Sequence, residues 1–226
     1  MLTFDVITIF PEAFDSYIKA SILGRAVKKR LVKINLVDLR RFTKDRHKTV
    51  DDRPYGGGAG MVMKAEPILK AVEEIKKKAK NEKQKIILLS AKGKQFSQKM
   101  AYALAKKYNN IIFISGRYEG IDERVKLILK ADEVSVGPYV LTDGDVATMA
   151  MISAVARLIP GVIKLESLRE ESHWNLRVKE EERGKLEYPH YTRPEVLEYK
   201  KKKYRVPPVL LSGDHKKIAE WRKERQ

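Results

Sequence analysis

GRYEGIDER, the sequence of Gly116–Arg124, begins two residues after the apolar run Ile111–Ile114. A short β-branched run that stops at glycine is typical of a buried strand that ends in a sharp turn. In open α/β sheets ligands bind beyond the carboxyl ends of the strands, where glycine lets the backbone approach them closely. The loop packs two glycines, one aromatic residue and five charged residues into nine positions, which indicates a binding loop. A solvated turn before a helix has a similar composition.

Strands and helices alternate on both sides of this loop. Apolar runs predict strands at Phe4–Ile9, Val32–Leu39, Lys85–Leu89, Ile111–Ile114 and Glu133–Val136. Helical spacing or small-residue composition predicts helices at Ala13–Arg30, Pro67–Ala79, Phe96–Tyr108, Ala147–Leu158 and Lys216–Arg225. This order predicts an α/β fold whose mostly parallel sheet is covered by helices on both faces.

Composition narrows the class of protein. The chain has 226 residues, of which 43% are hydrophobic, and this suits one large domain or a domain with a smaller appendage. The absence of cysteine excludes disulfides, zinc–thiolate sites and a cysteine nucleophile. No apolar run approaches the roughly 20 residues of a membrane span, and Met1–Val6 lacks the basic start of a signal peptide. We therefore expect a cytoplasmic protein that makes no membrane contact.

The net charge indicates the partner. The chain carries 47 Lys and Arg against 30 Asp and Glu, a net charge of +17, and such an excess is typical of a protein that binds nucleic acid. Heat adaptation is the alternative, with helix-like stretches such as Ala71–Lys80 and Glu195–Lys203 carrying charged surfaces. Heat adaptation enriches both signs, whereas this excess is one-sided, so we favour a polyanionic partner.

A second glycine-rich loop lies at Asp51–Gly60. It is not a mononucleotide phosphate loop, because Met61 and Val62 follow its last glycine where Lys-Ser or Lys-Thr is needed. A platform on which a base or cofactor lies against the backbone is one interpretation, and a mobile surface loop is the other.

Together these segments resemble the bacterial tRNA (guanine-N1)-methyltransferase family of the SPOUT superfamily. The similar motifs, in order, are Asp51–Met63, Gly116–Arg124, Tyr139–Thr142, Arg157–Val162, Tyr188–Pro194, Val206–His215 and Trp221–Arg222. The resemblance implies methylation, by S-adenosylmethionine, of N1 of the guanosine immediately 3′ of the tRNA anticodon. It also implies a sheet domain with a deep C-terminal trefoil knot, a small helical C-terminal domain, and a homodimer whose two sites each draw on both subunits.

The resemblance places the cofactor on three segments, where backbone groups read the adenine edge. The residues that it implies are Leu89, Ser90, Gly116, Tyr118, Gly120, Val136, Gly137, Pro138, Tyr139, Val140, Leu141 and Gly144. Pattern alone favours a core strand and a Gly-Pro turn for Val136–Leu141. Three positions in these segments depart from the family pattern: Ala91 replaces a proline, Pro138 replaces an acidic residue and removes an amide donor, and Asp143 replaces a glycine.

Methylation at N1 needs a base and a cation. N1 of neutral guanine carries a proton, and its removal gathers negative charge on O6. Arg157, at the end of an otherwise uncharged helix, matches the family's arginine for O6; without the resemblance it reads as an ordinary helix-end arginine. The family's base is an aspartate in an Asp-Ser pair, and Glu171 before Ser172 is its equivalent here, with Glu170 as the alternative.

The resemblance also divides the chain into domains. We expect a knotted catalytic domain over residues 1–162, a linker over 163–186, and a tRNA-binding region over 187–226 that is shorter than is usual for the family. The four histidines are scattered without metal-ligand spacing, so no metal site is predicted. The resemblance suggests that Mg²⁺ assists, but no carboxylate cluster in the sequence specifies a place for it.

Two other functions stay open. One is a catalytically weakened relative that binds RNA, which the replacement of aspartate by Glu171 supports. The other is a related methyltransferase that acts on another RNA position. The loop Gly116–Arg124 and Arg157 favour the tRNA (guanine-N1)-methyltransferase.

Overall fold

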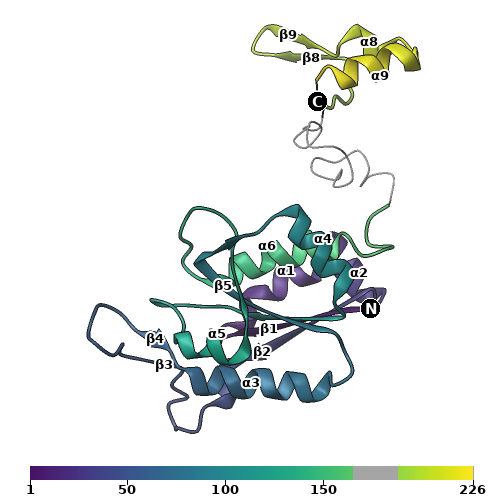
Figure 1. Ribbon diagram of the computed structural model, residues 1–226. Coiled ribbons are helices and arrows are strands. Elements are labelled where there is room, and N and C mark those ends of the chain that lie inside the picture. Colours follow the sequence, from purple (N-terminus) through teal and green to yellow (C-terminus); the bar gives the residue numbers. More distant parts are fainter. Residues whose placement is uncertain (165–187, 226) are drawn as a thin grey trace. The chain divides into compact units, whose positions relative to one another are not determined.

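The computed structural model describes residues 1–164 and 188–225. The chain divides into two compact units, Met1–Lys164 and Leu165–Gln226. The first unit is built on a five-stranded sheet in the order β2-β1-β6-β5-β7 (Figure 1). Every neighbouring pair in this sheet is parallel, which confirms the predicted α/β class. The strands are β1 (Leu2–Thr8), β2 (Val32–Asp38), β5 (Gln84–Gln95), β6 (Asn110–Ile114) and β7 (Asp132–Ser135).

Helices cover both faces of this sheet (Figure 1). On one face lie α1 (Asp15–Lys19), α2 (Ser21–Lys28), α4 (Gln98–Lys107) and α6 (Gly144–Ala156). On the other lie α3 (Ala65–Lys78) and α5 (Glu123–Leu129). Short elements complete the unit: the 3₁₀ turns η1 (Pro11–Phe14) and η2 (Leu39–Phe42), and the two-stranded sheet of β3 (Asp51–Asp52) and β4 (Val62–Met63).

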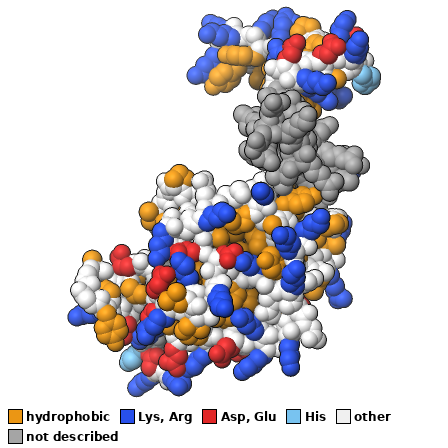
Figure 2. Space-filling view, viewed as in Figure 1, with side chains coloured by type: hydrophobic (Ala, Val, Ile, Leu, Met, Phe, Trp, Pro, Cys, Tyr) orange, Lys and Arg blue, Asp and Glu red, His pale blue; other side chains and the backbone are white. Residues whose placement is uncertain are grey.

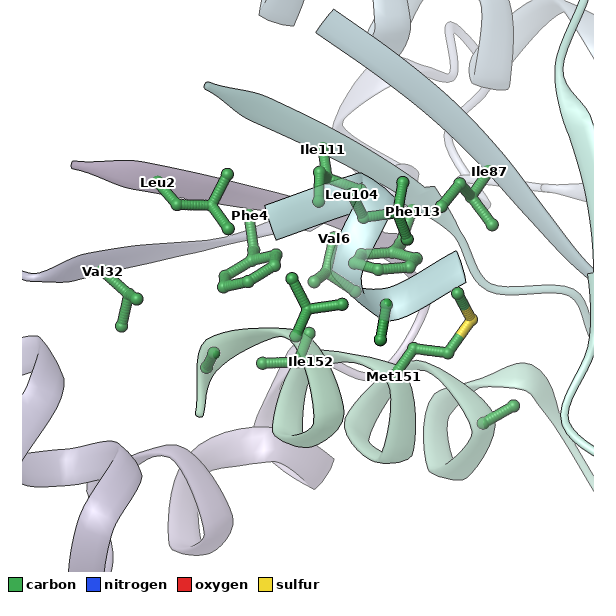
Figure 3. Close-up of a cluster of buried hydrophobic side chains, with 14 of the residues drawn as sticks. Leu2, Phe4, Val6, Val32, Ile87, Leu104, Ile111, Phe113, Met151 and Ile152 are labelled. Atoms are coloured by element: carbon green, nitrogen blue, oxygen red, sulfur yellow. The ribbon is translucent and has the colours of Figure 1, made fainter. Parts of the chain in front are cut away.

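The core explains why β6 is an apolar run after Asn110. Phe4 and Phe113 lie on neighbouring strands with their rings stacked 6.2 Å apart, and their side chains face Met151 and Ile152 of α6 (Figure 3). The alternate residues of the same strands, such as Ile112, pack on the opposite face among the side chains of α3 and α5. A strand buried on both faces has no polar alternation, which is why length and β-branching identify it.

The single helix predicted over Ala13–Arg30 is wrong, because the segment forms η1, α1 and α2 in succession. The break lies at Ala20, whose backbone is extended. There α2 turns back so closely on α1 that a Cβ at Gly24 would lie 2.3 Å from the carbonyl oxygen of Lys19. Glycine at position 24 makes this tight packing possible.

The described part of the second unit combines a β-hairpin with two helices. Its elements are β8 (Val196–Tyr199), β9 (Lys202–Arg205), α8 (Pro208–Leu211) and α9 (His215–Lys223). Trp221 of α9 is buried against Tyr191, and the Arg222 guanidinium lies 4.7 Å from the ring of Tyr188. The helix expected at the C-terminus is therefore present as α9.

The hairpin corrects the helical interpretation of Glu195–Lys203. β8 and β9 pair antiparallel, and the two residues between them, Lys200 and Lys201, have left-handed backbone angles of φ 49° and 63°. Such angles at both central positions form the tight turn that matches the twist of a hairpin. The expected small helical domain thus contains a hairpin as well as helices, and the trefoil knot stays a prediction.

Candidate functional site

A cleft of about 470 Å³ lies at the carboxyl edge of the sheet. The segments after β6 and β7, and Leu89–Lys92 within β5, form its walls, because parallel strands bring their carboxyl ends to the same edge. The volume is in the range of small-molecule sites. Of the residues predicted to bind the cofactor, those that line the cleft are Leu89, Ser90, Gly116, Tyr118, Gly120, Val136, Tyr139, Val140, Leu141 and Gly144.

The wall formed by Leu89–Lys92 is shaped by an irregularity in β5. Val134 of β7 pairs with Leu89 and again with Lys94, so the four residues between them leave the ladder. A Cβ at Gly93 would lie 2.5 Å from the backbone nitrogen of Val134. Only glycine allows this approach, and the irregularity turns Ser90 toward the cleft.

The other two walls, which are the loop after β6 and the segment from β7 to the start of α6, are joined by a backbone hydrogen bond. The amide of Gly144 donates to the carbonyl of Gly116 over 2.8 Å. A Cβ at Gly144 would lie 2.8 Å from the backbone nitrogen of Gly116 and 3.0 Å from the Ser115 hydroxyl. The loop after β6 and the start of α6 are therefore held at a separation that a side chain at position 144 would increase.

A buried carboxylate joins these two walls. Asp145, 2% exposed, accepts hydrogen bonds from the hydroxyls of Thr8 and Ser115 at 2.8 and 2.6 Å. Its other oxygen lies 3.0 Å from the Arg117 guanidinium, which also lies 3.2 Å from Asp143. Two carboxylates at the start of α6 thus bind the arginine of the loop after β6, so this loop has one preferred position.

The glycine-rich segment between β3 and β4 reaches the same loop. Met63 donates its amide to Gly120 and accepts from the amide of Asp122, at 2.9 and 3.1 Å, and Glu119 donates to Met61 at 3.0 Å. Val62 lines the cleft, whereas Tyr55 at the tip is 99% exposed. The two glycine-rich loops that the sequence singled out therefore form one continuous surface.

Tyr118 links the two loops electrostatically. Burial raises the pKa of Tyr118, and the nearby Asp51 carboxylate, which is also its hydrogen-bond partner, raises it further. The phenol therefore stays neutral at physiological pH and keeps its proton as a hydrogen-bond donor.

Two lysines and two glutamates form an ion cluster in the cleft wall. Lys92 lies 3.1 Å from Glu123 and 3.7 Å from Glu133, and Lys126 lies 2.7 Å from Glu133. Burial alone would raise the pKa of Glu133, but hydrogen bonds from Lys126 and Ser90 outweigh it and lower this pKa. Glu133 is thus an ionised carboxylate beside Ser90, held by two lysines in the wall of the cleft.

Two of the predicted cofactor residues, Gly137 and Pro138, do not line the cleft. Ser135 donates its hydroxyl to the Gly137 carbonyl over 2.8 Å, and the Tyr139 ring fills the space where a Cβ of Gly137 would lie. These contacts fix the conformation of the turn. Gly137 therefore affects the cleft through the position of the Tyr139 ring, which lines it.

Of the predicted catalytic residues, the structure describes only Arg157, and Arg157 does not line the cleft. Arg157 is the C-cap of α6, whose first turn carries the cleft residues Gly144 and Ala147. A helix of 13 residues rises about 20 Å from one end to the other. Arg157 therefore lies at the end of α6 remote from the cleft of its own chain. Glu170 and Glu171 lie outside the described residues.

Residues 1–164 and 188–225 offer neither a metal-binding cluster nor a membrane-spanning helix. No group of three or more His, Asp or Glu side chains is placed to hold a metal ion. No helix there has the length and apolarity that a membrane crossing requires.

Comparison with known proteins decides the family. The family model described as tRNA (Guanine-1)-methyltransferase TrmD matches residues 2–226. The chain belongs to this family. Its relatives include proteins named tRNA (guanine-N(1)-)-methyltransferase from Dictyoglomus turgidum, 51% identical over 99% of this chain and 84% of the relative, and from Carboxydothermus hydrogenoformans, 48% identical over 97% and 81%. A third, from Nostoc punctiforme, is 45% identical over 100% of this chain and 88% of the relative. The resemblance drawn from the sequence motifs is confirmed.

Membership of the TrmD family implies use of S-adenosylmethionine, and the cleft suits such a ligand. Gly116 leaves part of its backbone exposed at the cleft, and the exposed side chains of Tyr139, Val140 and Leu141 add apolar area. Sequence reasoning missed the residues that hold this cleft in shape, Asp145 and Glu133. A carboxylate in the first turn of an otherwise apolar helix was the available signal for Asp145.

Proposed function

We propose that this protein transfers the methyl group of S-adenosylmethionine to N1 of the guanosine immediately 3′ of a tRNA anticodon. The observation that carries the proposal is the cleft at the carboxyl edge of the sheet, in the part of the chain that the TrmD family model matches. The net charge of +17 supports a polyanionic substrate. The bound cofactor supplies an electrophilic methyl group, and the protein must supply a base and a binding place for guanine.

The chain's own residues have separable roles in this proposal. The walls at Leu89–Ser90, Gly116–Gly120 and Val136–Gly144 hold the cofactor, with Glu133 and Ser90 at its polar end. Glu171 removes the N1 proton, and Arg157 binds O6, where the negative charge develops. The S-adenosylmethionine held in the cleft would supply the methyl carbon to N1, with the thioether sulfur as leaving group, and the Glu171 carboxylate would keep the proton that it takes from N1. Residues 1–162 form the catalytic domain and 187–226 contact tRNA.

The position of Arg157 supports a homodimer with shared sites. An arginine at the far end of α6 reaches guanine beside the cleft of a second subunit more readily than beside its own. Mixed dimers test this arrangement. We expect homodimers of Arg157→Ala and homodimers of Gly116→Val to be nearly inactive. A mixed dimer with one subunit of each kind should regain one active site, because the intact cleft of the Arg157→Ala subunit is completed by the intact Arg157 of the other subunit. No recovery in the mixed dimer would place both groups in one subunit.

Methyl transfer to defined tRNA transcripts tests the function. The purified protein, labelled S-adenosylmethionine and a transcript with G at the target position should give label in the tRNA, and the same transcript with A there should give none. Tight binding of both transcripts without transfer would favour the weakened RNA-binding relative. Equal labelling of both would favour a methyltransferase that acts on another position.

A further inference from the structure

The β8–β9 hairpin in the second unit is exposed on both faces. Leu197, Tyr199 and Tyr204 share one face with Lys202, because residues two apart in a strand point the same way and the pairs are Leu197–Tyr204 and Tyr199–Lys202. These three apolar side chains are 54%, 60% and 54% exposed, respectively. A two-stranded hairpin is only marginally stable alone in water, so this exposed face indicates a partner.

Charge indicates which partner this is. The turn and β9 carry Lys200, Lys201, Lys202, Lys203 and Arg205. Glu198, the one acidic residue of the hairpin, lies 2.9 Å from Lys203 on the opposite face. Among residues 1–164 and 188–225, neither Lys201 nor Lys202 makes an ion pair. Figure 2 shows Lys and Arg side chains gathered with hydrophobic ones at this end of the unit.

We propose that the β8–β9 hairpin is an RNA-binding element, which contacts the phosphate backbone through Lys200, Lys201 and Lys202. The face made of Leu197, Tyr199 and Tyr204 packs against the adjoining ribose and base. Alternating aromatic and basic side chains suit RNA, since aromatic rings stack on bases and ammonium groups neutralise phosphates. A protein partner for this face would need an acidic surface, and the proposed substrate already supplies a polyanion. This inference rests on the proposed tRNA substrate and assigns part of its binding to one hairpin.

The salt dependence of tRNA binding tests the lysines. Lys200→Gln/Lys201→Gln/Lys202→Gln in the full chain should lower tRNA affinity about 10- to 100-fold near 0.1 M salt and reduce the slope of log K against log salt by about 2. The matched control is Lys76→Gln/Lys77→Gln/Lys80→Gln, which removes the same charge from an exposed site in and after α3. The control should change the slope by less than about 0.5. Equal slopes for the two triple variants would overturn the proposal.

The tyrosines provide an independent test. Tyr199→Ala/Tyr204→Ala should weaken tRNA binding by about 10-fold or more with the slope unchanged, because stacking does not release counterions. Tyr199→Phe/Tyr204→Phe should retain affinity. Loss of dimer mass in sedimentation with unchanged tRNA affinity would assign this face to a second copy of the chain and overturn the proposal.

The two proposals fail in distinguishable ways. The hairpin inference fails alone if the wild-type protein methylates tRNA and the hairpin variants bind it as tightly as the wild type. The proposed function fails if the wild-type protein transfers no methyl group. In that case the salt dependence of tRNA binding still tests the hairpin inference.

Discussion

The guanidinium of Arg117 lies 3.0 Å from the carboxylate of Asp145, in an ion pair that connects two walls of the cleft at the carboxyl edge of the sheet. Asp145 is also bound by Thr8 of β1 and Ser115 after β6, and the Arg117 guanidinium covers the ring of Phe10 at 4.4 Å. One buried carboxylate thus fixes the loop after β6 to the sheet and to α6. We infer that this pair sets the geometry of the cleft without touching the reacting atoms.

Asp145→Asn should lower both the stability of the fold and the affinity for S-adenosylmethionine. The substitution keeps the shape of the side chain and removes the charge that pairs with Arg117, so the free energy of unfolding should fall by about 1–3 kcal/mol. Cofactor affinity should fall at least about tenfold, because a site must hold its geometry within roughly 0.5 Å. Denaturation and calorimetry measure the two quantities.

Asp132→Asn is the control for this prediction. Asp132 pairs with Lys85 across β5 and β7, but its side chain is half exposed, so the loss should stay below about 1 kcal/mol. Equal effects of the two substitutions on cofactor affinity would show that Asp145 has no special role in the cleft.

Gly116→Val should abolish S-adenosylmethionine binding while the protein stays folded. A Cβ at Gly116 has its nearest neighbours, Ile121 and the carbonyl of Leu89, at 3.4 Å, so alanine fits but the two further methyl groups of valine fill cleft space. Gly116→Ala is therefore the matched control and should retain measurable binding. Calorimetry on the folded variants decides, and unchanged affinity in the valine variant would remove the cleft from consideration.

The affinities for tRNA and for S-adenosylmethionine should respond differently to salt. Affinity for tRNA should fall by about 10³-fold or more between ~50 and ~200 mM salt as counterions are released. Affinity for S-adenosylmethionine should barely change over this range, since glycine backbone and apolar side chains form much of its cleft. Parallel titrations check this, and an equal response of both ligands would mean that the positive charge does not serve RNA binding.

Glu171→Gln should slow single-turnover methylation about 10²- to 10⁴-fold, the usual effect of losing a general base. Glutamate and aspartate have similar acidity, so the longer side chain changes the reach of the base more than its strength. Binding of tRNA and cofactor should persist. Glu170→Gln, one position away, should cost far less. A reversal of the two effects would make Glu170 the base, and no effect from either would assign deprotonation to another group.

The sheet was predictable from sequence because its strands are short buried runs such as Ile111–Ile114, flanked by helical segments. The hairpin was not, because the lysines of Glu195–Lys203 favour helix by propensity, while the left-handed Lys200 and Lys201 reverse the chain. Motif similarity located the cleft walls. Asp145 and Thr8 are 137 residues apart, and only tertiary folding joins them, so no local pattern could reveal their contact.

The most direct test of the account is the identity of the methylated nucleoside. Wild-type protein, S-adenosylmethionine and an unmodified tRNA transcript with G next to the anticodon are incubated, and the tRNA is digested to nucleosides for chromatography and mass spectrometry. The account predicts 1-methylguanosine, in an amount approaching one per tRNA, with none from a transcript that carries A at this position. Methylation at another atom of guanine, on ribose or at another nucleotide, or the absence of any methylated nucleoside, would contradict it.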